Sequence, residues 1–410
     1  MNHIYKISFL KLRILAFVSI SIGYSIFSDA QANTDFGKWI KDFETVALQN
    51  GISRSTYKKS FIGIISPDPE IISLVRSQPE FDQNLWMYFD NRVNQKSISR
   101  GQEMERKWNS WLHRLEKQYG VSRYILLAIW SMETDYGEAL KKDESLRSVI
   151  RSLATLAYFD EKRRKFAYRQ LIAAMKIVQR GIISPKQLRG SWAGAMGHTQ
   201  FIPTSYLAYA QDANGDGKQN IWTSVPDALA TAANLLHCNG WKSGKPWGYE
   251  ISIPDQLMNQ KGKERSIASW VKLGVKRVNG KPFPTLNDRG VLSVPTGKGG
   301  PAFVMTRNFF VIKRYNNADK YALAVGYLAD QIAGSGEFKN PFPRPLNQFT
   351  FEERREFQTL LSVKGFYNGE IDGKFGIRTR RAIRKAQESL GINPDGLQSF
   401  AILKQLRDQR

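Results

Sequence analysis

The sequence is poor in cysteine, since only Cys238 occurs among its 410 residues. One cysteine cannot form a disulfide within the chain, so the fold has to be stabilised by its own apolar core. Apolar residues make up 42% of the sequence, which is enough for such a core and for two or three domains. Cys238 ends a predicted helix over 227–238 with no catalytic motif around it, which predicts a buried structural thiol rather than a nucleophile.

Acidic residues are also scarce, with 37 Asp and Glu against 60 Lys and Arg and a formal net charge of +23. Such a charge calls for an acidic partner, which is nucleic acid, anionic lipid or a carboxylate-rich wall polymer. The basic residues are spread along the chain instead of forming one tract, and no recognised nucleic-acid-binding module accompanies them. The sequence therefore predicts no nucleic-acid partner.

Long apolar runs are missing beyond the N-terminal segment. Within it, Lys6, Lys11 and Arg13 precede an apolar run over 14–27, and Ala-Gln-Ala at 30–32 has the small-x-small pattern of a cleavage site. Residues 1–32 are therefore predicted to be a secretory signal peptide, with an uncleaved anchor as the alternative. The run is short for a membrane span, no second one of about 20 residues follows, and no cysteine stands at the cleavage point. We expect a soluble exported protein without a stable membrane span.

Helical periodicity dominates the next part of the chain, with apolar residues three to four apart in segments such as 101–119 and 165–179. The residue pattern changes over 249–314, where Gly, Pro and Asn separate short β-branched or aromatic runs. These runs predict strands at 250–253, 291–294 and 309–312. The fold class is therefore expected to be mainly α (α+β).

The C-terminal part is set off by a change in composition. A helix over 317–332 is predicted to close the body at 33–333, and 334–348 is rich in Gly, Ser and Pro, which is typical of a linker. The last segment, 349–410, predicts helices over 350–364 and 379–390 and a short terminal one.

The strongest candidate for chemistry is Glu133. An almost unbroken apolar helix from Tyr124 ends in this one carboxylate, and Gly137 suits a left-handed stop after it. An apolar setting disfavours the charged form, so the carboxyl can stay protonated near neutral pH and donate a proton to a leaving oxygen. A surface glutamate at a helix end is the alternative. Asp135, the nearest rival carboxylate, is expected on the surface of the turn.

A second segment, 190–206, gathers three glycines and two alanines within eight residues, which lets a backbone come close to a sugar ring or to a neighbouring helix. Ser191, Gln200 and Tyr206 offer neutral hydrogen bonds. His198 has no second histidine within ligand spacing, so it is expected at the rim and not as a base or ligand.

Together these segments resemble the membrane-bound lytic transglycosylase B family, which has a lysozyme-like core. The resemblance rests on Glu-Thr-x-Tyr-Gly after an Ala-Ile-Trp helix and on Gly-Ser-x-Ala-Gly-Ala-Met-Gly-x-x-Gln-Phe-x-Pro, and it covers about 36–332. Further matches lie at Gln-Pro-Glu-Phe over 78–81, Ser-Leu-Ala-Thr-Leu-Ala over 152–157, and Arg-Tyr-Asn over 314–316 followed by Tyr321.

The resemblance implies that Glu133 is the single catalytic residue. It also implies paired substrate-binding arginines at Arg163 and Arg164, for which a solvated helix face is the alternative, and a set of sugar-contacting positions: Ser191, Gln200, Phe201, Tyr315, Asn316 and Tyr321. The family reaction cleaves peptidoglycan between N-acetylmuramic acid and N-acetylglucosamine, assisted by the substrate's acetamido group, and leaves a 1,6-anhydromuramyl end without consuming water. A muramidase that uses a positioned water and a non-catalytic wall-binding scaffold are the alternatives.

The family carries an EF-hand-like calcium site where this chain has Asp212, Asn214 and Asp216 at loop positions 1, 3 and 5. Lys218 stands at position 7, and Thr223 occupies position 12, where a standard loop has glutamate; Asp227 is the expected substitute. A metal-free Asn-Gly/Asp-Gly turn is the alternative. The chemistry itself requires no cofactor.

The tail has Asp-Gly-x-Phe-Gly at 372–376 and Pro-Asp-Gly at 394–396, and it is similar to the three-helix peptidoglycan-binding domain. Such a domain would tether the catalytic body to its polymer and raise the local substrate concentration. The expected partner is therefore the peptidoglycan glycan strand, the expected location is the periplasm in association with the wall, and the expected state is a monomer.

Overall fold

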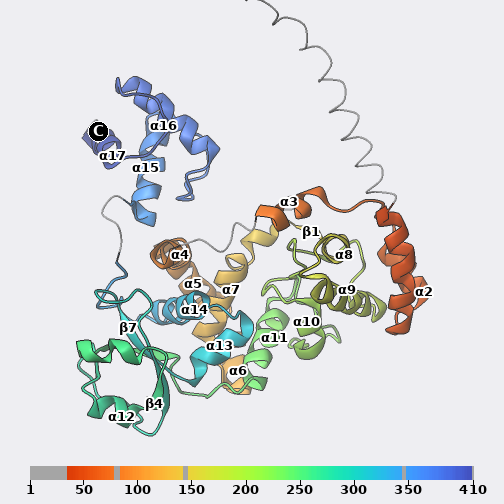
Figure 1. Cartoon of the computed structure of the whole chain (residues 1–410), viewed down its shortest axis with the longest axis horizontal. Helices are drawn as coiled ribbons and strands as arrows, with labels where there is room; N and C mark the ends of the chain where they lie inside the picture. Colours follow the sequence, from red (N-terminus) through yellow and green to blue (C-terminus); the bar gives the residue numbers. More distant parts are fainter. Residues whose placement is uncertain (1–34, 78–83, 142–145, 344–347, 409–410) are drawn as a thin grey trace, which may run out of the picture. The chain divides into compact units, whose positions relative to one another are not determined.

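The computed structural model describes residues 35–77, 84–141, 146–343 and 348–408 (Figure 1). The predicted signal peptide, the Gln-Pro-Glu-Phe match at 78–81 and residues 344–347 of the predicted linker lie outside these ranges. The described chain falls into two compact units. Unit 1 contains 35–77, 146–196 and 200–208, and unit 2 contains 84–141, 197–199, 209–343 and 348–408. Within the described ranges, no helix combines the length and hydropathy that crossing a bilayer requires.

Unit 1 is helical and is built around the hairpin of α8 (Val149–Phe159) and α9 (Arg164–Gln179). Ser148 caps α8 by accepting a hydrogen bond from the Arg151 amide, and the buried residues of α8 are mostly apolar, with Ser152 and Thr155 among them. The other elements of the unit are a helix over 35–49, α2 (Arg54–Ser60), α3 (Pro69–Ser77), α10 (Pro203–Tyr209) and the two-stranded sheet of β1 (Arg147–Ser148) and β2 (Arg189–Gly190).

The helical body of unit 2 surrounds α7 (Arg123–Thr134), whose residues from Ile125 to Met132 are all buried. A helix that is apolar on every side has to be enclosed by other helices, and α5, α6, α11 and α14 all pack against it. The body comprises α4 (Leu85–Arg92), α5 (Gln95–Lys107), α6 (Asn109–Tyr119), α11 (Val225–Cys238), α13 (Arg307–Tyr315) and α14 (Asp319–Ile332), with a 3-10 turn at Glu138–Lys141. In α14, Gly326 makes room for the Trp247 ring, which a Cβ would meet at 2.5 Å.

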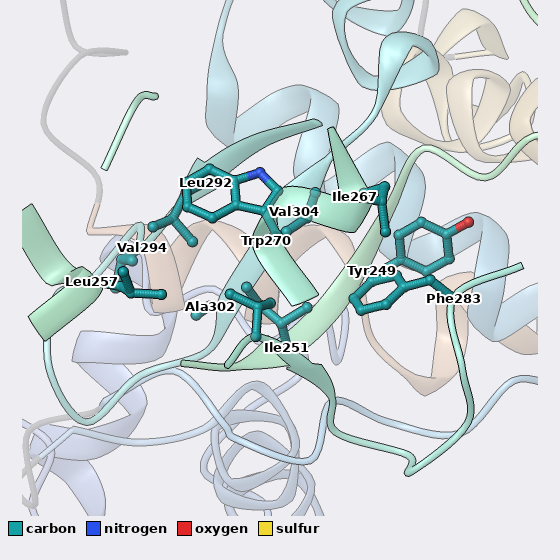
Figure 2. Packing of buried hydrophobic residues seen from close by; sticks show 11 residues of the cluster. Tyr249, Ile251, Leu257, Ile267, Trp270, Phe283, Leu292, Val294, Ala302 and Val304 are labelled. Carbon is teal, nitrogen blue, oxygen red and sulfur yellow. The ribbon is translucent and has the colours of Figure 1, made fainter. Parts of the chain in front are cut away.

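A five-stranded antiparallel sheet forms the β-containing part of unit 2, in the order β4-β6-β7-β3-β5. Its strands are β3 (Gly248–Ser252), β4 (Glu264–Ser266), β5 (Lys276–Arg277), β6 (Arg289–Ser293) and β7 (Ala302–Met305). Burial alternates along β3 and β6, so one face of the sheet is apolar. Trp270, on α12 (Ile267–Lys272), lies in the cluster on that face (Figure 2) and donates its indole N–H to the Gly290 carbonyl at 2.9 Å.

Replacing Trp270 with alanine is expected to lower the free energy of unfolding by about 3–5 kcal/mol, because a fully buried indole and its hydrogen bond are lost. Denaturant unfolding of the full chain measures this. Val271→Ala, one residue further and 42% exposed, serves as the control and should change stability by less than about 0.5 kcal/mol. Equal stabilities for the two variants would contradict the packing described.

The C-terminal part contains α15 (Phe351–Val363), α16 (Ile377–Ser389) and α17 (Phe400–Asp408) around one apolar cluster. The same hydrogen-bond arrangement, a glutamine side chain bonded to an Asp-Gly pair, occurs twice in this part. Gln358 donates to Asp372 and accepts from the Gly373 amide at 3.0 and 2.7 Å. Gln387 likewise donates to Asp395 and accepts from the Gly396 amide at 2.7 and 2.8 Å. Each buried glutamine thus fixes one of the Asp-Gly turns recognised in the sequence.

The fold class predicted from the sequence, mainly α with a small β part and three C-terminal helices, is confirmed. Two local predictions are wrong. Residues 309–312, expected as a strand, belong to helix α13, while the strand of this region is β7. Cys238 was expected to be buried, but it is exposed, because it is the last residue of α11.

Two predicted elements need adjustment. The helical pattern over 101–119 is divided at Trp108 into α5 and α6. Part of the predicted linker packs on the body of unit 2, since the Phe338 ring stacks on Tyr327 with centroids 3.9 Å apart. The amides of Lys339 and Asn340 donate to the Glu250 carboxylate at 3.0 and 2.9 Å. This stretch is therefore held in place by ring stacking and by a carboxylate.

Candidate active site

Helix α7 carries Glu133 in its last turn and ends at once. Asp135 is the left-handed cap, with φ of 49°, and Tyr136 and Gly137 continue with φ of 57° and 90°. The left-handed stop thus begins two residues before the predicted Gly137. Among the described residues, only Asp135, Tyr136 and Gln200 have positive φ without being glycine. Backbone strain of this kind tends to gather at functional sites, and here it flanks the candidate carboxyl.

The Glu133 carboxyl is enclosed by the protein of unit 2. The Tyr321 hydroxyl donates to Glu133 Oε1 at 2.6 Å, and the Tyr321 side chain is itself buried. Although the residue retains some accessible surface, burial raises the Glu133 pKa to about 7, against the lowering effects of the Tyr321 hydrogen bond and of the Arg92 charge. A carboxyl with this pKa can give up and retake a proton near neutral pH.

A second tyrosine supports the first. The Tyr315 ring stacks on Tyr321 with an interplanar angle of 6° and centroids 6.4 Å apart, and its hydroxyl donates to the Thr199 carbonyl. Burial and the nearby Glu133 raise the pKa of both phenols well above their usual value, so both remain protonated donors. Asn316, also predicted at the site, is exposed and follows α13 as its cap.

Arg92 is a residue at this site that the sequence did not single out. It ends α4 and donates from Nη1 to the Met132 carbonyl at 3.0 Å. Its positive charge lies close enough to Glu133 to oppose the rise of that pKa. Its partner is a main-chain carbonyl 40 residues further along the chain, so no local sequence pattern marks the contact.

His198 holds the end of α7 in place. The Trp130 indole N–H donates to His198 Nδ1 at 3.1 Å, and the Thr134 hydroxyl donates to the His198 carbonyl at 2.6 Å. Burial lowers the His198 pKa to about 4, so the ring is neutral at physiological pH and accepts the indole proton. His198 thus fixes residues on both sides of Glu133, holding Trp130 through its half-buried ring and Thr134 through its backbone carbonyl.

Unit 1 contains the other predicted substrate residues, and the two arginines differ in their contacts. Arg164 donates to the carbonyls of Ala157 and Tyr158 at 3.1 and 3.4 Å, which closes the end of α8. Arg163 lies over the Trp192 ring, with Cζ 5.5 Å from the centroid, and its buried Nη1 has no hydrogen-bond partner among the described residues. Of the pair, Arg163 keeps a donor for a ligand.

The small-residue segment of unit 1 forms a tight loop. Gly190 is required there because a Cβ would meet the Ala195 carbonyl oxygen at 2.1 Å. Ser191 accepts the Ala195 amide at 3.0 Å and is half-buried. The close approach at Gly190 therefore serves the loop itself, which is a packing role and not contact with a guest sugar.

The remaining predicted residues of unit 1 follow that loop. Met196 and Phe201 exchange backbone hydrogen bonds at 2.9 Å around the strained, half-buried Gln200. Phe201 is a core residue. Tyr206 is 0% exposed, so the expectation that its hydroxyl offers a hydrogen bond to a sugar at the surface is wrong.

The predicted metal loop lies in unit 2 and brings three carboxylates together. One ligand oxygen each from Asp212, Asp216 and Asp227 lies within 4.8 Å of the others. Asp227 is fully buried and accepts the amides of Ala213 and Asn220, both at 2.9 Å. Among the described residues, no lysine or arginine forms an ion pair with this cluster. The oxygen set fits a hard cation such as Ca²⁺, although position 12 is Thr223, which adds no carboxylate.

Replacing Arg92 with glutamine is expected to raise the Glu133 pKa further, because a nearby positive charge is removed. The high-pH fall of kcat/KM that a general acid at Glu133 implies should move to higher pH, with less than about a ten-fold change at the optimum. The pH profile of cleavage measures this, and Arg92→Lys, which keeps the charge, is the control. An unshifted pH profile in Arg92→Gln would show that the Arg92 charge has no effect on the Glu133 pKa.

Comparisons with known proteins agree with this geometry. The model of the transglycosylase SLT domain matches residues 35–330, and that of the putative peptidoglycan binding domain matches 351–406. Membrane-bound lytic murein transglycosylase B of Escherichia coli (strain K12) is 26% identical over 297 residues, which is 71% of this chain and 79% of that protein.

Two solved structures from Pseudomonas aeruginosa are also similar. SltB3, in complex with NAG-anhNAM-pentapeptide, gives a TM-score of 0.72 at 39% identity and covers 91% of this chain and 99% of its own. The soluble lytic transglycosylase SltB1 gives 0.63 at 26% identity, covering 73% of this chain and 98% of its own.

A lysozyme-like α-rich body with one enclosed carboxyl, joined to a wall-binding module, defines a lytic transglycosylase, a lyase that acts on peptidoglycan. The chain belongs to the transglycosylase SLT family.

Proposed function

We propose that Glu133 is the one acid and base of this enzyme. It would cleave the β-1,4 bond between N-acetylmuramic acid and N-acetylglucosamine and leave a 1,6-anhydromuramyl end. The observation that carries the proposal is the enclosed carboxyl with a pKa raised to about 7 and a direct hydrogen bond from Tyr321. An acid that also serves as base works best when its pKa lies near the working pH.

The steps follow from this one group. Protonated Glu133 gives its proton to the glycosidic oxygen while positive charge develops at C1 of the muramyl sugar. The ionised carboxylate then takes the proton of the muramyl 6-hydroxyl, whose oxygen bonds to C1. Tyr321 stabilises the ionised form by donating to Oε1. Asp135, the nearest other carboxylate in the chain, forms an ion pair with Arg100 at 3.6 Å and is 44% exposed, so it is not a nucleophile poised in an apolar setting.

Mass spectrometry of digested sacculi tests the reaction. A transglycosylase product lacks one water relative to a reducing muropeptide, and that mass is expected. Products at the hydrated mass would instead identify a muramidase, in which water replaces the 6-hydroxyl as the attacking group.

We also propose substrate contacts other than Glu133 in each of the two units. In unit 1 we propose Arg163, with its unpartnered Nη1 and the Trp192 ring beneath it, as a contact for a substrate oxygen or carboxylate. Arg164, Ser191 and Gln200, which match substrate-binding positions of the family, are the other proposed substrate contacts of unit 1. In unit 2 the exposed Asn316 is the proposed sugar contact.

We also propose that the enzyme is exported to the periplasm as a monomer. The basic N-terminal segment with its apolar run and Ala-Gln-Ala pattern supports export. A substrate that lies outside the cytoplasm is consistent with this location.

For the loop around Asp216 we propose a structural calcium site of low affinity, since three carboxylates converge there without a glutamate at position 12. Millimolar calcium is expected to raise the melting temperature of the full chain by about 2–4 °C. Asp216→Asn should abolish the rise, while Asp255→Asn, an exposed carboxylate paired with Lys298, should retain it. Equal melting temperatures with calcium and with chelator would favour the metal-free turn.

A further inference from the structure

Two isoleucines of unit 1 are exposed on the turn that follows α2. Ile62 is 78% exposed and Ile65 is 79% exposed. The turn is ordered by a hydrogen bond from the Ile64 amide to the Phe61 carbonyl at 3.0 Å, and the Phe61 ring lies against Tyr57 with centroids 4.8 Å apart. The base of the turn is therefore anchored, while the side chains of Ile62 and Ile65 face solvent. Exposing both has no structural benefit within unit 1.

A basic pocket of about 660 Å³ lies beside this turn. Ile62 forms part of its wall, and its charged lining residues are all cationic: Lys59, Arg151, Lys186 and Arg189. No carboxylate occurs among the described residues that line it. The larger pocket beside the sheet of unit 2 differs, because there Lys245 pairs with Asp288 at 2.9 Å and Arg289 with Glu264 at 3.3 Å. Lys59, Arg151 and Lys186 form no ion pair within the described part of the chain, so this pocket keeps an excess of positive charge.

The pocket also has a fixed frame and an unused donor. Arg151 donates to the carbonyls of Ser66 and Pro67 at 3.1 and 3.0 Å, which ties the far end of the turn to α8. Ser60 is 3% exposed, and its hydroxyl has no hydrogen-bond partner within the described part of the chain. A buried hydroxyl without an acceptor, in a pocket of cations, is suited to an anionic oxygen.

We propose that the turn over 61–66 and the basic pocket beside it dock on the surface of an anionic phospholipid membrane. Ile62 and Ile65 enter the interfacial region of the bilayer, while Lys59 and Lys186 face lipid phosphates. Apolar insertion and attraction to anionic lipid add to each other in such peripheral contacts. Docking of this kind would place a peptidoglycan-cleaving enzyme at the membrane side of its polymer.

The exposed isoleucines favour a membrane over the other anionic partner, a carboxylate-bearing wall peptide. A peptide in the pocket would neutralise the cations, but it would leave Ile65 in water, since that residue does not line the pocket. A bilayer covers both the charges and the two apolar side chains.

Vesicle co-sedimentation tests the proposal. The full-length gene is expressed, and the protein is purified after the cell has processed it. Binding to phosphatidylglycerol-rich vesicles should exceed binding to phosphatidylcholine vesicles and weaken with salt. The double variant Ile62→Ser/Ile65→Ser should bind the vesicles at least about ten-fold more weakly than the original protein. The double variant Lys59→Gln/Lys186→Gln should lose vesicle binding to a similar extent. The matched control is Val363→Ser, which removes an 80% exposed apolar side chain from α15 and should leave vesicle binding unchanged.

Cleavage of soluble glycan fragments, measured in parallel, should be the same in all these variants, which separates docking from catalysis. Vesicle binding that survives the isoleucine changes would overturn the proposal. Loss of sacculus binding together with vesicle binding in the lysine variant, with no effect of the isoleucines, would assign the pocket to wall carboxylates instead.

Discussion

Glu133→Gln is expected to reduce peptidoglycan cleavage by about 10³-fold or more, because one residue supplies both the acid and the base of the reaction. Glutamine keeps the shape of the side chain and still accepts the Tyr321 hydrogen bond, so the site should stay folded. Release of soluble muropeptides from sacculi measures the loss. Pelleting with sacculi should be unchanged, since residues 351–406 form the wall-binding part.

A matched control lies five residues away. Glu138→Gln removes a carboxylate that pairs with Lys141 at 2.7 Å near the surface, and it should leave cleavage within about two-fold of the original. Cleavage that persists in Glu133→Gln would remove this residue from the chemistry.

The same change should reveal a cost in stability. The folded-state pKa of Glu133 is raised to about 7 from 4.5, so the folded protein holds this proton more tightly than the unfolded chain. The stability that the protonated Glu133 carboxyl contributes to the folded protein is therefore lost as pH rises from about 4.5 through about 7. Glutamine has no proton to lose, so the variant should match the original enzyme at pH 4 and gain up to about 3 kcal/mol above pH 7. Denaturant unfolding at the two pH values measures this difference.

Tyr321→Phe is the second large effect, with an expected fall in kcat of about 10–100-fold. The Tyr321 hydroxyl donates to Glu133 Oε1 at 2.6 Å, and hydrogen bonds to charged groups contribute about 1.5–3 kcal/mol. The bond favours the ionised form that has to take the 6-hydroxyl proton. Its loss should also raise the Glu133 pKa, so the high-pH fall of activity should move to higher pH.

Tyr327→Phe is the control for this change, because Tyr327 lies on the same helix and packs on Phe338 instead of Glu133. It should show neither the fall in kcat nor the shift. A Tyr321→Phe enzyme with normal kcat and an unmoved pH profile would show that the hydrogen bond has no part in the reaction.

The position of Glu133 could be predicted from the sequence because its signal is local. One carboxylate at the end of an apolar helix predicts desolvation, and in the structure Glu133 is half-buried, with its pKa raised by burial. The tyrosines came only from the family resemblance, since Tyr321 is 188 residues away from Glu133. Neither a local sequence pattern nor the family resemblance marks Arg92, because its hydrogen bond goes to the main-chain carbonyl of Met132.

The errors in the fold have similar causes. A run of four apolar residues at 309–312 fits both a buried strand and a buried helix, and the tertiary contacts of α13 decided between them. The strand β7 is buried on both faces, so it lacks the alternation that marks β3 and β6. Tyr206 was assigned from its chemistry, but depth in the core is set by packing and not by residue type.

The titration of the Glu133 carboxyl tests the account most directly. Carbon-13 NMR of the enzyme labelled at glutamate carboxyls, with the resonance assigned by its absence in Glu133→Gln, follows this one group from pH 4 to 9. The account predicts a midpoint near pH 7, where burial places it. A midpoint near 4.5, the value of a glutamate in water, would show a carboxylate that has no proton to donate at neutral pH.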